Sequence, residues 1–216
     1  MRKIISVLAS ALIAAMAFST IAHAGSEAHT HIEHVINSWN DTPSERGLLP
    51  TAMKEGLVAA AHANYAAKAK DDLGQMKMHA RHVRHAIDPT LEAGGPGMGY
   101  GLIKAANGAV EHITLASESA GASSAVKTHT VHVVSSLNNA IARSRLALIE
   151  AMAIYNAETA SDAAPHAVKM AELTKAGLLG IDANDDGKIS WQKGEGGLKV
   201  ADKHMGLMLD AEGLKR

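Results

Sequence analysis

The chain has 216 residues, nearly balanced charge, 13 histidines, no cysteine and few aromatic side chains. The lack of cysteine excludes disulfides, thiolate metal ligands and cysteine-attached haem. A net charge near zero leads us to expect no nucleic-acid partner and no anionic-membrane partner. Abundant Ala, Leu and Met with scarce aromatics predict an all-α protein, a helical bundle of about four to five helices.

The N-terminus is typical of a signal peptide that spans residues 1–24. Arg2 and Lys3 precede an apolar run that ends near Phe18, and Ala22-His23-Ala24 matches the small-x-small cleavage pattern. We therefore expect a periplasmic or secreted protein with no membrane insertion after cleavage. The alternative is a retained membrane anchor.

The next part of the chain, residues 25–160, is predicted to form a His-rich helical bundle. Apolar residues at helical spacing, with breaks at Pro43, Pro89 and a Gly-rich stretch, define its helices. The Gly-rich stretch, 94–101, lacks the Gly-Lys-Ser/Thr of a phosphate loop, so we interpret it as a tight connection. The predicted helices cover about 26–39, with Ser26 as N-cap, then 50–70, 102–119 and 124–156. Between the second and the last two, a turn or kink at 71–74 leads into a helix that ends before Pro89; the alternative is a single long helix through Gly74.

The motif His-x-x-His-Val occurs three times, each time in a predicted helix, beginning at His31, His79 and His129. Residues three apart lie on nearly the same helix face with Cβ atoms roughly 5–6 Å apart, so two imidazoles can share one metal ion. This recurrence predicts a transition-metal site between helices. The candidate ligands are His31, His34, His62, His79, His82, His85, His112, His129 and His132.

Structural interpretations of single histidines stay open beside this hypothesis. His129 falls in the predicted apolar stripe of its helix, where a core histidine bonded to backbone would also fit. His82 and His85 share a face that suits either a ligand layer or solvent. We nevertheless expect His79, His82, His129 and His132 to act together, although spacing does not show which helices face each other.

The C-terminal region carries a second, independent motif, placed in a predicted module over residues 161–216. It resembles positions 1 to 9 of an EF-hand calcium loop, flanked by predicted helices at about 164–180 and 198–214. Position 12 departs from the family, because Lys193 stands where a bidentate Glu is usual. Glu195 would supply this carboxylate from a lengthened loop; the alternative is an Asx-rich turn that binds nothing. The predicted calcium ligands are Asp182, Asn184, Asp186, Lys188 through its carbonyl, Ser190 and Glu195.

These motifs predict a non-catalytic protein that stores, buffers or delivers a transition metal. Imidazole without thiolate suits Cu, Zn, Ni or Fe, and Ca²⁺ is the second expected ion. The helices lack the Glu-x-x-His motifs of di-iron bundles. The alternatives are a b-type haem bundle, a metalloenzyme with an open coordination position, and an interaction protein whose histidines respond to pH.

Overall fold

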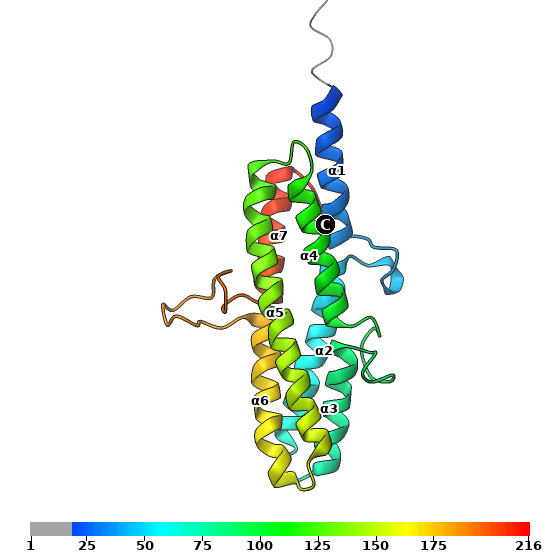
Figure 1. Ribbon diagram of the computed structural model, residues 1–216, viewed down its shortest axis with the longest axis vertical. Helices are drawn as coiled ribbons and strands as arrows, with labels where there is room; N and C mark the ends of the chain where they lie inside the picture. Colours follow the sequence, from blue (N-terminus) through cyan, green and yellow to red (C-terminus); the bar gives the residue numbers. More distant parts are fainter. Residues whose placement is uncertain (1–18) are drawn as a thin grey trace, which may run out of the picture.

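The computed structural model describes residues 19–216, and this part of the chain is all-helical, without a strand (Figure 1). The all-α bundle is thus confirmed, and the five helices expected before residue 160 plus the two expected around the loop account for the seven α-helices found within residues 19–216. The predicted signal peptide lies mostly outside the described residues. The elements are α1 (Ser19–Ile36), the 3-10 helix η1 (Pro43–Glu45), α2 (Leu48–Lys68), α3 (Leu73–Ile87), α4 (Leu102–Glu118), α5 (Ser124–Asn156), α6 (Ala160–Leu179) and α7 (Leu198–Glu212).

The helices form two four-helix layers, one above the other along the long axis of the molecule (Figure 1). Helix α5, with 33 residues, is about 50 Å long and runs through both layers. The upper layer consists of α1, α4, α7 and the first half of α5; the lower layer consists of α2, α3, α6 and the second half of α5. Because α6 and α7 both pack on α5, the C-terminal helices belong to the same helical body as the rest.

Small buried residues set the distance between these helices. The lower core contains Ala63 from α2, Ala80 from α3, Ala151 from α5 and Ala167 from α6, each fully buried. Alanine is the strongest helix former and allows close approach of two backbones. Side chains on neighbouring helices that flank such a seam are therefore brought near one another.

The helix ends follow the residues that cap them. Asp72 accepts a hydrogen bond from the backbone N–H of Gln75, so α3 begins at Leu73, inside the segment predicted as a turn. Ser123 accepts one from the backbone N–H of Val126, and α5 begins at Ser124, as predicted. The first helix differs from the prediction, since Ser26 lies inside α1 and is not its N-cap. This helix ends at Ile36, which leaves Trp39 in the turn that follows.

A buried carboxylate forms hydrogen bonds with the backbone of the Gly-rich connection between α3 and α4. Oε1 of Glu55, on α2, accepts hydrogen bonds from the backbone N–H groups of Met98, Tyr100 and Gly101 at 3.1–3.2 Å. Gly97 has a φ of 127°, and a Cβ there would meet Oε2 of Glu55. The loop therefore serves as a packed connection.

No α-helix within residues 19–216 has both the length and the apolar character that a membrane span would require.

Candidate metal centres

Three groups of histidines in the described part of the chain could each hold a metal ion. Each group takes two histidines from a His-x-x-His pair on one helix and a third histidine, here called the hub histidine, from a second helix. The ligand nitrogens of each group lie within 4.8 Å of one another. Centre 1 is His31, His34 and hub His112; centre 2 is His79, His82 and hub His62; centre 3 is His129, His132 and hub His204.

The Nδ1 atom of each hub histidine lies within hydrogen-bonding distance of both partners. In centre 1 the Nδ1 atom of His112 lies 3.0 Å from that of His31 and 3.3 Å from that of His34. The corresponding distances are 3.0 and 3.2 Å in centre 2, and both are 3.2 Å in centre 3. Metal–nitrogen bonds of about 2.0–2.1 Å at tetrahedral angles place ligand nitrogens about 3.3 Å apart. The hub distances thus match those around a single metal ion.

Hydrogen bonds alone satisfy such a triad poorly. A neutral imidazole nitrogen carries either one proton or one lone pair. The Nδ1 atom of a hub histidine therefore cannot form a separate, well-directed hydrogen bond with each of two neighbouring Nδ1 atoms. A metal ion accepts all three lone pairs at once, so the arrangement suits coordination better than protonation.

Burial lowers the pKa of seven of these imidazoles. Desolvation, followed by the charges of His82 and His79, lowers the pKa of His62 to about 4. Desolvation also lowers the pKa of His204 to about 4, with His132 and His129 as the next causes. A lowered pKa leaves the lone pair free for a metal ion. Burial is likewise the main cause of the lowered pKa of His34, His79, His82, His112 and His132.

The metal-free protein is expected to lose stability as the pH falls from about 6.5 to about 4. In the unfolded chain His62 and His204 take up protons at their ordinary pKa of 6.5, whereas in the folded chain they stay neutral until about pH 4. The unfolded state then binds more protons, so this contribution to stability is complete above pH 6.5 and declines below it.

Urea unfolding of the metal-free protein at pH 8, 6.5 and 5 measures this effect. The double variant His62→Gln/His204→Gln should show a weaker decline between these pH values. An equally steep decline in the double variant would show that the hub histidines are not its source.

An aromatic side chain adjoins each centre. The ring of Trp39 lies 4.8 Å from that of His34 and 4.5 Å from that of His112, between centroids. In centre 2, Tyr65 lies 5.5 Å from His62. In centre 3, Trp191 stacks on His132 at 4.2 Å. These contacts restrict the orientation of the ligand rings and shield one side of each centre from water.

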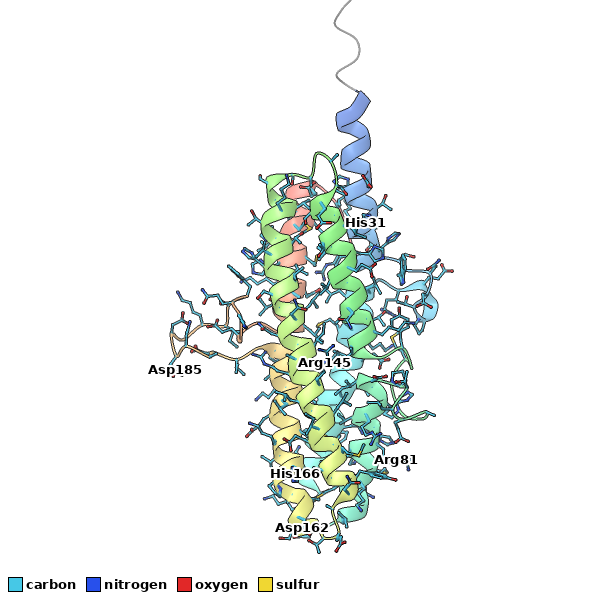
Figure 2. The ribbon with its side chains drawn as sticks, in the orientation of Figure 1. His31, Arg81, Arg145, Asp162, His166 and Asp185 are labelled. Atoms are coloured by element: carbon cyan, nitrogen blue, oxygen red, sulfur yellow. The ribbon has the colours of Figure 1, made fainter. Side chains whose placement is uncertain are left out.

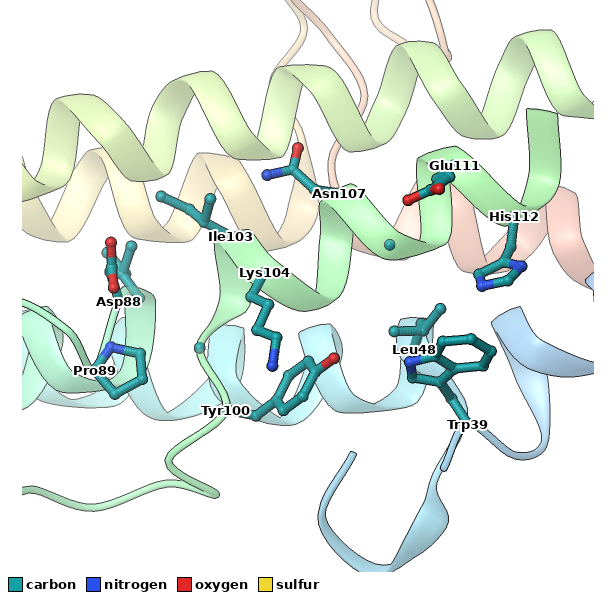
Figure 3. Close-up of a pocket in the computed structure, with 13 residues that line it drawn as sticks. Trp39, Leu48, Asp88, Pro89, Tyr100, Ile103, Lys104, Asn107, Glu111 and His112 are labelled. Carbon is teal, nitrogen blue, oxygen red and sulfur yellow. The ribbon is translucent and has the colours of Figure 1, made fainter. Parts of the chain in front are cut away.

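A pocket of about 510 Å³ opens beside centre 1. Figure 3 shows His112 and Trp39 at one end of this pocket and Pro89 and Asp88 at the other. Lys104 lies between them and forms an ion pair of 2.7 Å with Asp41. The pocket gives a small molecule a route to the edge of centre 1.

The structure brings together eight of the nine histidines that the sequence nominates, in three separate centres. His79 and His82 form part of centre 2, whereas His129 and His132 form part of centre 3, so the four do not share one site. His129 lies at the edge of the α5 core stripe, half-buried, rather than within it. The eight are His31, His34, His62, His79, His82, His112, His129 and His132.

His85 is the nominated histidine that joins no triad. Its Nδ1 atom lies 2.8 Å from the carbonyl oxygen of Glu92, and its ring packs against Gly95 of the Gly-rich connection. Successive steps of three residues each rotate a helical side chain by about −60°. Two such steps carry His85 about 120° away from His79, onto the face that the connection covers.

Sequence reasoning missed the hub His204, which lies in α7, inside the segment assigned to the calcium module. The chain carries a signal for two of the hubs, His62 and His112, whereas His204 shares with them only a register that burial reveals. His62, His79 and His82 recur fifty residues later as His112, His129 and His132. His62 and His112 each follow a buried alanine by three residues, Ala59 and Ala109, and His204 follows Ala201 in the same way.

The predicted calcium loop projects from the side of the bundle between α6 and α7, with Asp185 at its tip (Figure 2). Oxygens of Asp182 accept backbone hydrogen bonds from Asp186 and Gly187, and Asn184 accepts one from Asp186. Buried Glu195 accepts one from the backbone N–H of Ser190. Arg143 of α5 anchors the end of the loop through the carbonyl oxygens of Glu195 and Gly196.

Calcium binding by this loop stays a prediction. The carboxylates of the loop do not form one of the three groups of converging ligands found among the described residues. If the loop binds Ca²⁺, free Ca²⁺ at about 100 times its Kd adds about 2.7 kcal/mol of stability, or about 5–10 °C in Tm. The double variant Asp182→Ala/Asp186→Ala should lose this increase, whereas Asp185→Ala, outside the predicted ligand set, should keep it. A Tm of the unmodified protein that does not respond to Ca²⁺ would refute the EF-hand prediction.

No protein-family model, curated protein or solved structure matches the chain. The geometry of the three centres is therefore the basis for inferring what they bind.

Proposed function

We propose that this is an exported protein that holds one first-row transition-metal ion in each of its three histidine centres and buffers or delivers these ions. The observation that carries the proposal is repetition. Three different helix pairs, α1 with α4, α2 with α3 and α5 with α7, present the same three-nitrogen arrangement. Three chance clusters of half-buried imidazoles with the same pair-plus-hub pattern would be costly to stabilise without a common ligand.

The donor set indicates which ions bind. Three imidazoles without thiolate or carboxylate favour Zn, Cu, Ni or Fe over Mg²⁺ and Ca²⁺, which prefer oxygen ligands. Three protein ligands leave a fourth tetrahedral position open to water or to an incoming ligand. The ligand histidines are half-buried rather than enclosed, so ions can exchange with solvent or with another protein. Exchange of this kind supports buffering and delivery.

The geometry disfavours the haem alternative. The two axial ligands of a haem iron stand on opposite sides of a planar ring whose four nitrogens occupy the other positions. In each centre the three imidazole nitrogens converge on one point, with hub contacts of only 3.0–3.3 Å. A porphyrin has no place between ligands this close together.

Elemental analysis and an absorption spectrum of the exported protein, purified without a His tag or chelator, test the proposal. We expect up to three equivalents of Zn, Cu, Ni or Fe and no Soret band. Metal-free protein that also takes up no added Zn²⁺, Cu²⁺ or Ni²⁺ would overturn the proposal, and a Soret band would replace it with the haem alternative.

Tryptophan emission adds a reading of individual centres, because Trp39 and Trp191 are the chain's two tryptophans and adjoin centres 1 and 3. Bound Cu²⁺ should quench both. The variant His112→Ala should keep the quenching of Trp191 and lose that of Trp39, whereas His62→Ala, in centre 2, should keep both.

The pocket beside centre 1 favours a second candidate function, a metal-dependent enzyme that acts at this centre. A small molecule in the pocket would have access to His112 and to an open coordination position of its metal ion. The variant His62→Ala/His204→Ala restricts loading to centre 1, and Co²⁺ bound there reports its ligands in the visible spectrum. If azide added to this protein leaves the Co²⁺ spectrum unchanged, no open position exists and the enzyme candidate fails.

A further inference from the structure

A fourth histidine stands opposite a partner on the neighbouring helix, as the hub histidines do. His166 of α6 faces Glu150 of α5, and its Nδ1 atom lies 2.6 Å from Oε2 of the carboxylate (labelled His166 in Figure 2). In the lower layer, α5 and α6 form the helix pair opposite α2 and α3, which carry centre 2. The same layer thus has one position with three histidines and a second position of different composition.

His166 occupies the same register on its helix as the three hub histidines. In all four cases the residues at −3, +1 and +4 are buried, and the residue at −3 is alanine. These buried residues are Ala59, Ala63 and Ala66 around His62; Ala109, Ile113 and Ala116 around His112; Ala201, Met205 and Met208 around His204; and Ala163, Ala167 and Met170 around His166.

Glu150 occupies the register of the first histidine in each His-x-x-His pair. Buried residues again stand at −3, +1 and +4: Ala28, Ile32 and Val35 around His31; Met76, Ala80 and Val83 around His79; Val126, Thr130 and Val133 around His129; and Ala147, Ala151 and Ile154 around Glu150. Ala153 then stands where the second histidine of a pair would be, and Ile154 where the motif has Val. The α5–α6 position therefore repeats the design of the centres with two of the three imidazoles replaced.

This replacement removes the requirement for a metal ion at the α5–α6 position. A carboxylate accepts a hydrogen bond from an imidazole N–H, so Glu150 and His166 satisfy each other without a metal ion. The centres instead bring three basic nitrogens together, which only a metal ion satisfies fully.

We propose that the α5–α6 position is a fourth site of the same design that holds no transition metal, and that Glu150 and Ala153 set the capacity of the protein at three ions. The inference rests on the proposed function of the three centres. It predicts that restoring the two imidazoles creates a fourth centre with His166 as its hub.

Zn²⁺ titration followed by elemental analysis of the unmodified protein and of Glu150→His/Ala153→His tests this inference. We expect three bound ions in the unmodified protein and four in the double variant. Adding His166→Ala to the double variant should return the number to three, which controls for nonspecific binding by the added histidines. Circular dichroism monitors folding, and Ala153→His alone, which assembles two imidazoles and a carboxylate, is the second variant if the double variant fails to fold.

Two results would overturn the inference. One is a double variant that folds and still binds only three ions. The other is an unmodified protein that binds four ions and loses one with His166→Ala. Failure of the proposed function gives a different result, because the unmodified protein then binds no metal ion. In that case the double variant binds one ion if its substitutions have created the fourth centre, and no ion if they have not.

Discussion

Replacing one hub histidine with alanine is expected to remove one metal equivalent and to leave the other two centres loaded. Each hub Nδ1 atom is the one that lies within 3.3 Å of both other ligands of its centre. Its removal leaves two imidazoles on a single helix, which cannot surround an ion. Because loss of an outer-shell partner alone typically costs 10–100-fold in metal affinity, loss of the hub ligand should cost more than about 100-fold.

Equilibrium dialysis against Zn²⁺ with His62→Ala, His112→Ala and His204→Ala, singly and in combination, measures this result. The bound number should fall from three to two in each single variant and to zero in the triple variant. His29→Ala and His166→Ala are matched controls, because both histidines are half-buried on helices but pair with carboxylates, Glu212 and Glu150. A control that loses an ion, or a single hub variant that loses all three, would contradict three independent centres.

The sequence is sufficient to predict the His-x-x-His pair of each centre, because both of its histidines lie on one helix. The periodicity of α5 gives a helix whose bounds match the structure, Pro89 marks the end of α3, and spacing alone places His79 beside His82. This success has a simple cause, since a separation of three residues on a helix fixes distance without any tertiary information.

The partner helix of each pair is not encoded in local spacing. His62 and His79 are separated by 17 residues, and so are His112 and His129. The first two meet within the α2–α3 hairpin, whereas His112 meets the α1 pair and His129 meets His204 of α7. Which face of α4 or α5 receives a given neighbour depends on the packing of the whole upper layer, so equal spacings lead to different contacts.

The missed His204 illustrates the same limit at long range. It lies 75 residues from His129 and carries no neighbouring histidine, so no motif singles it out. Its position relative to buried residues does single it out, because Ala201 at −3 and Met205 at +1 are buried, as are the corresponding residues at the other hub histidines. A buried pattern of this kind can be compared between helices only once the core is known.

Removal of metal is expected to lower the stability of the protein by a large amount. Free ion at about 100 times the Kd of a site contributes about 2.7 kcal/mol, so three independent sites contribute about 8 kcal/mol, or about 16–32 °C in Tm for a domain of this size. The physical reason is that each proposed ion would join two helices. Centre 1 joins α1 to α4, centre 2 joins α2 to α3, and centre 3 joins α5 to α7.

Calorimetry of the Zn²⁺-loaded and chelator-treated protein measures the change in Tm. Hydrogen exchange of the same two samples shows which helices the metal stabilises. Helix α1 packs on α4 and, less extensively, on α2, so centre 1 should slow exchange in α1 most clearly. The triple variant His62→Ala/His112→Ala/His204→Ala should melt at the same temperature with and without Zn²⁺. If the triple variant gains as much stability as the parent, the ion acts somewhere other than between these helices, and the cross-links inferred from the nine histidines do not exist.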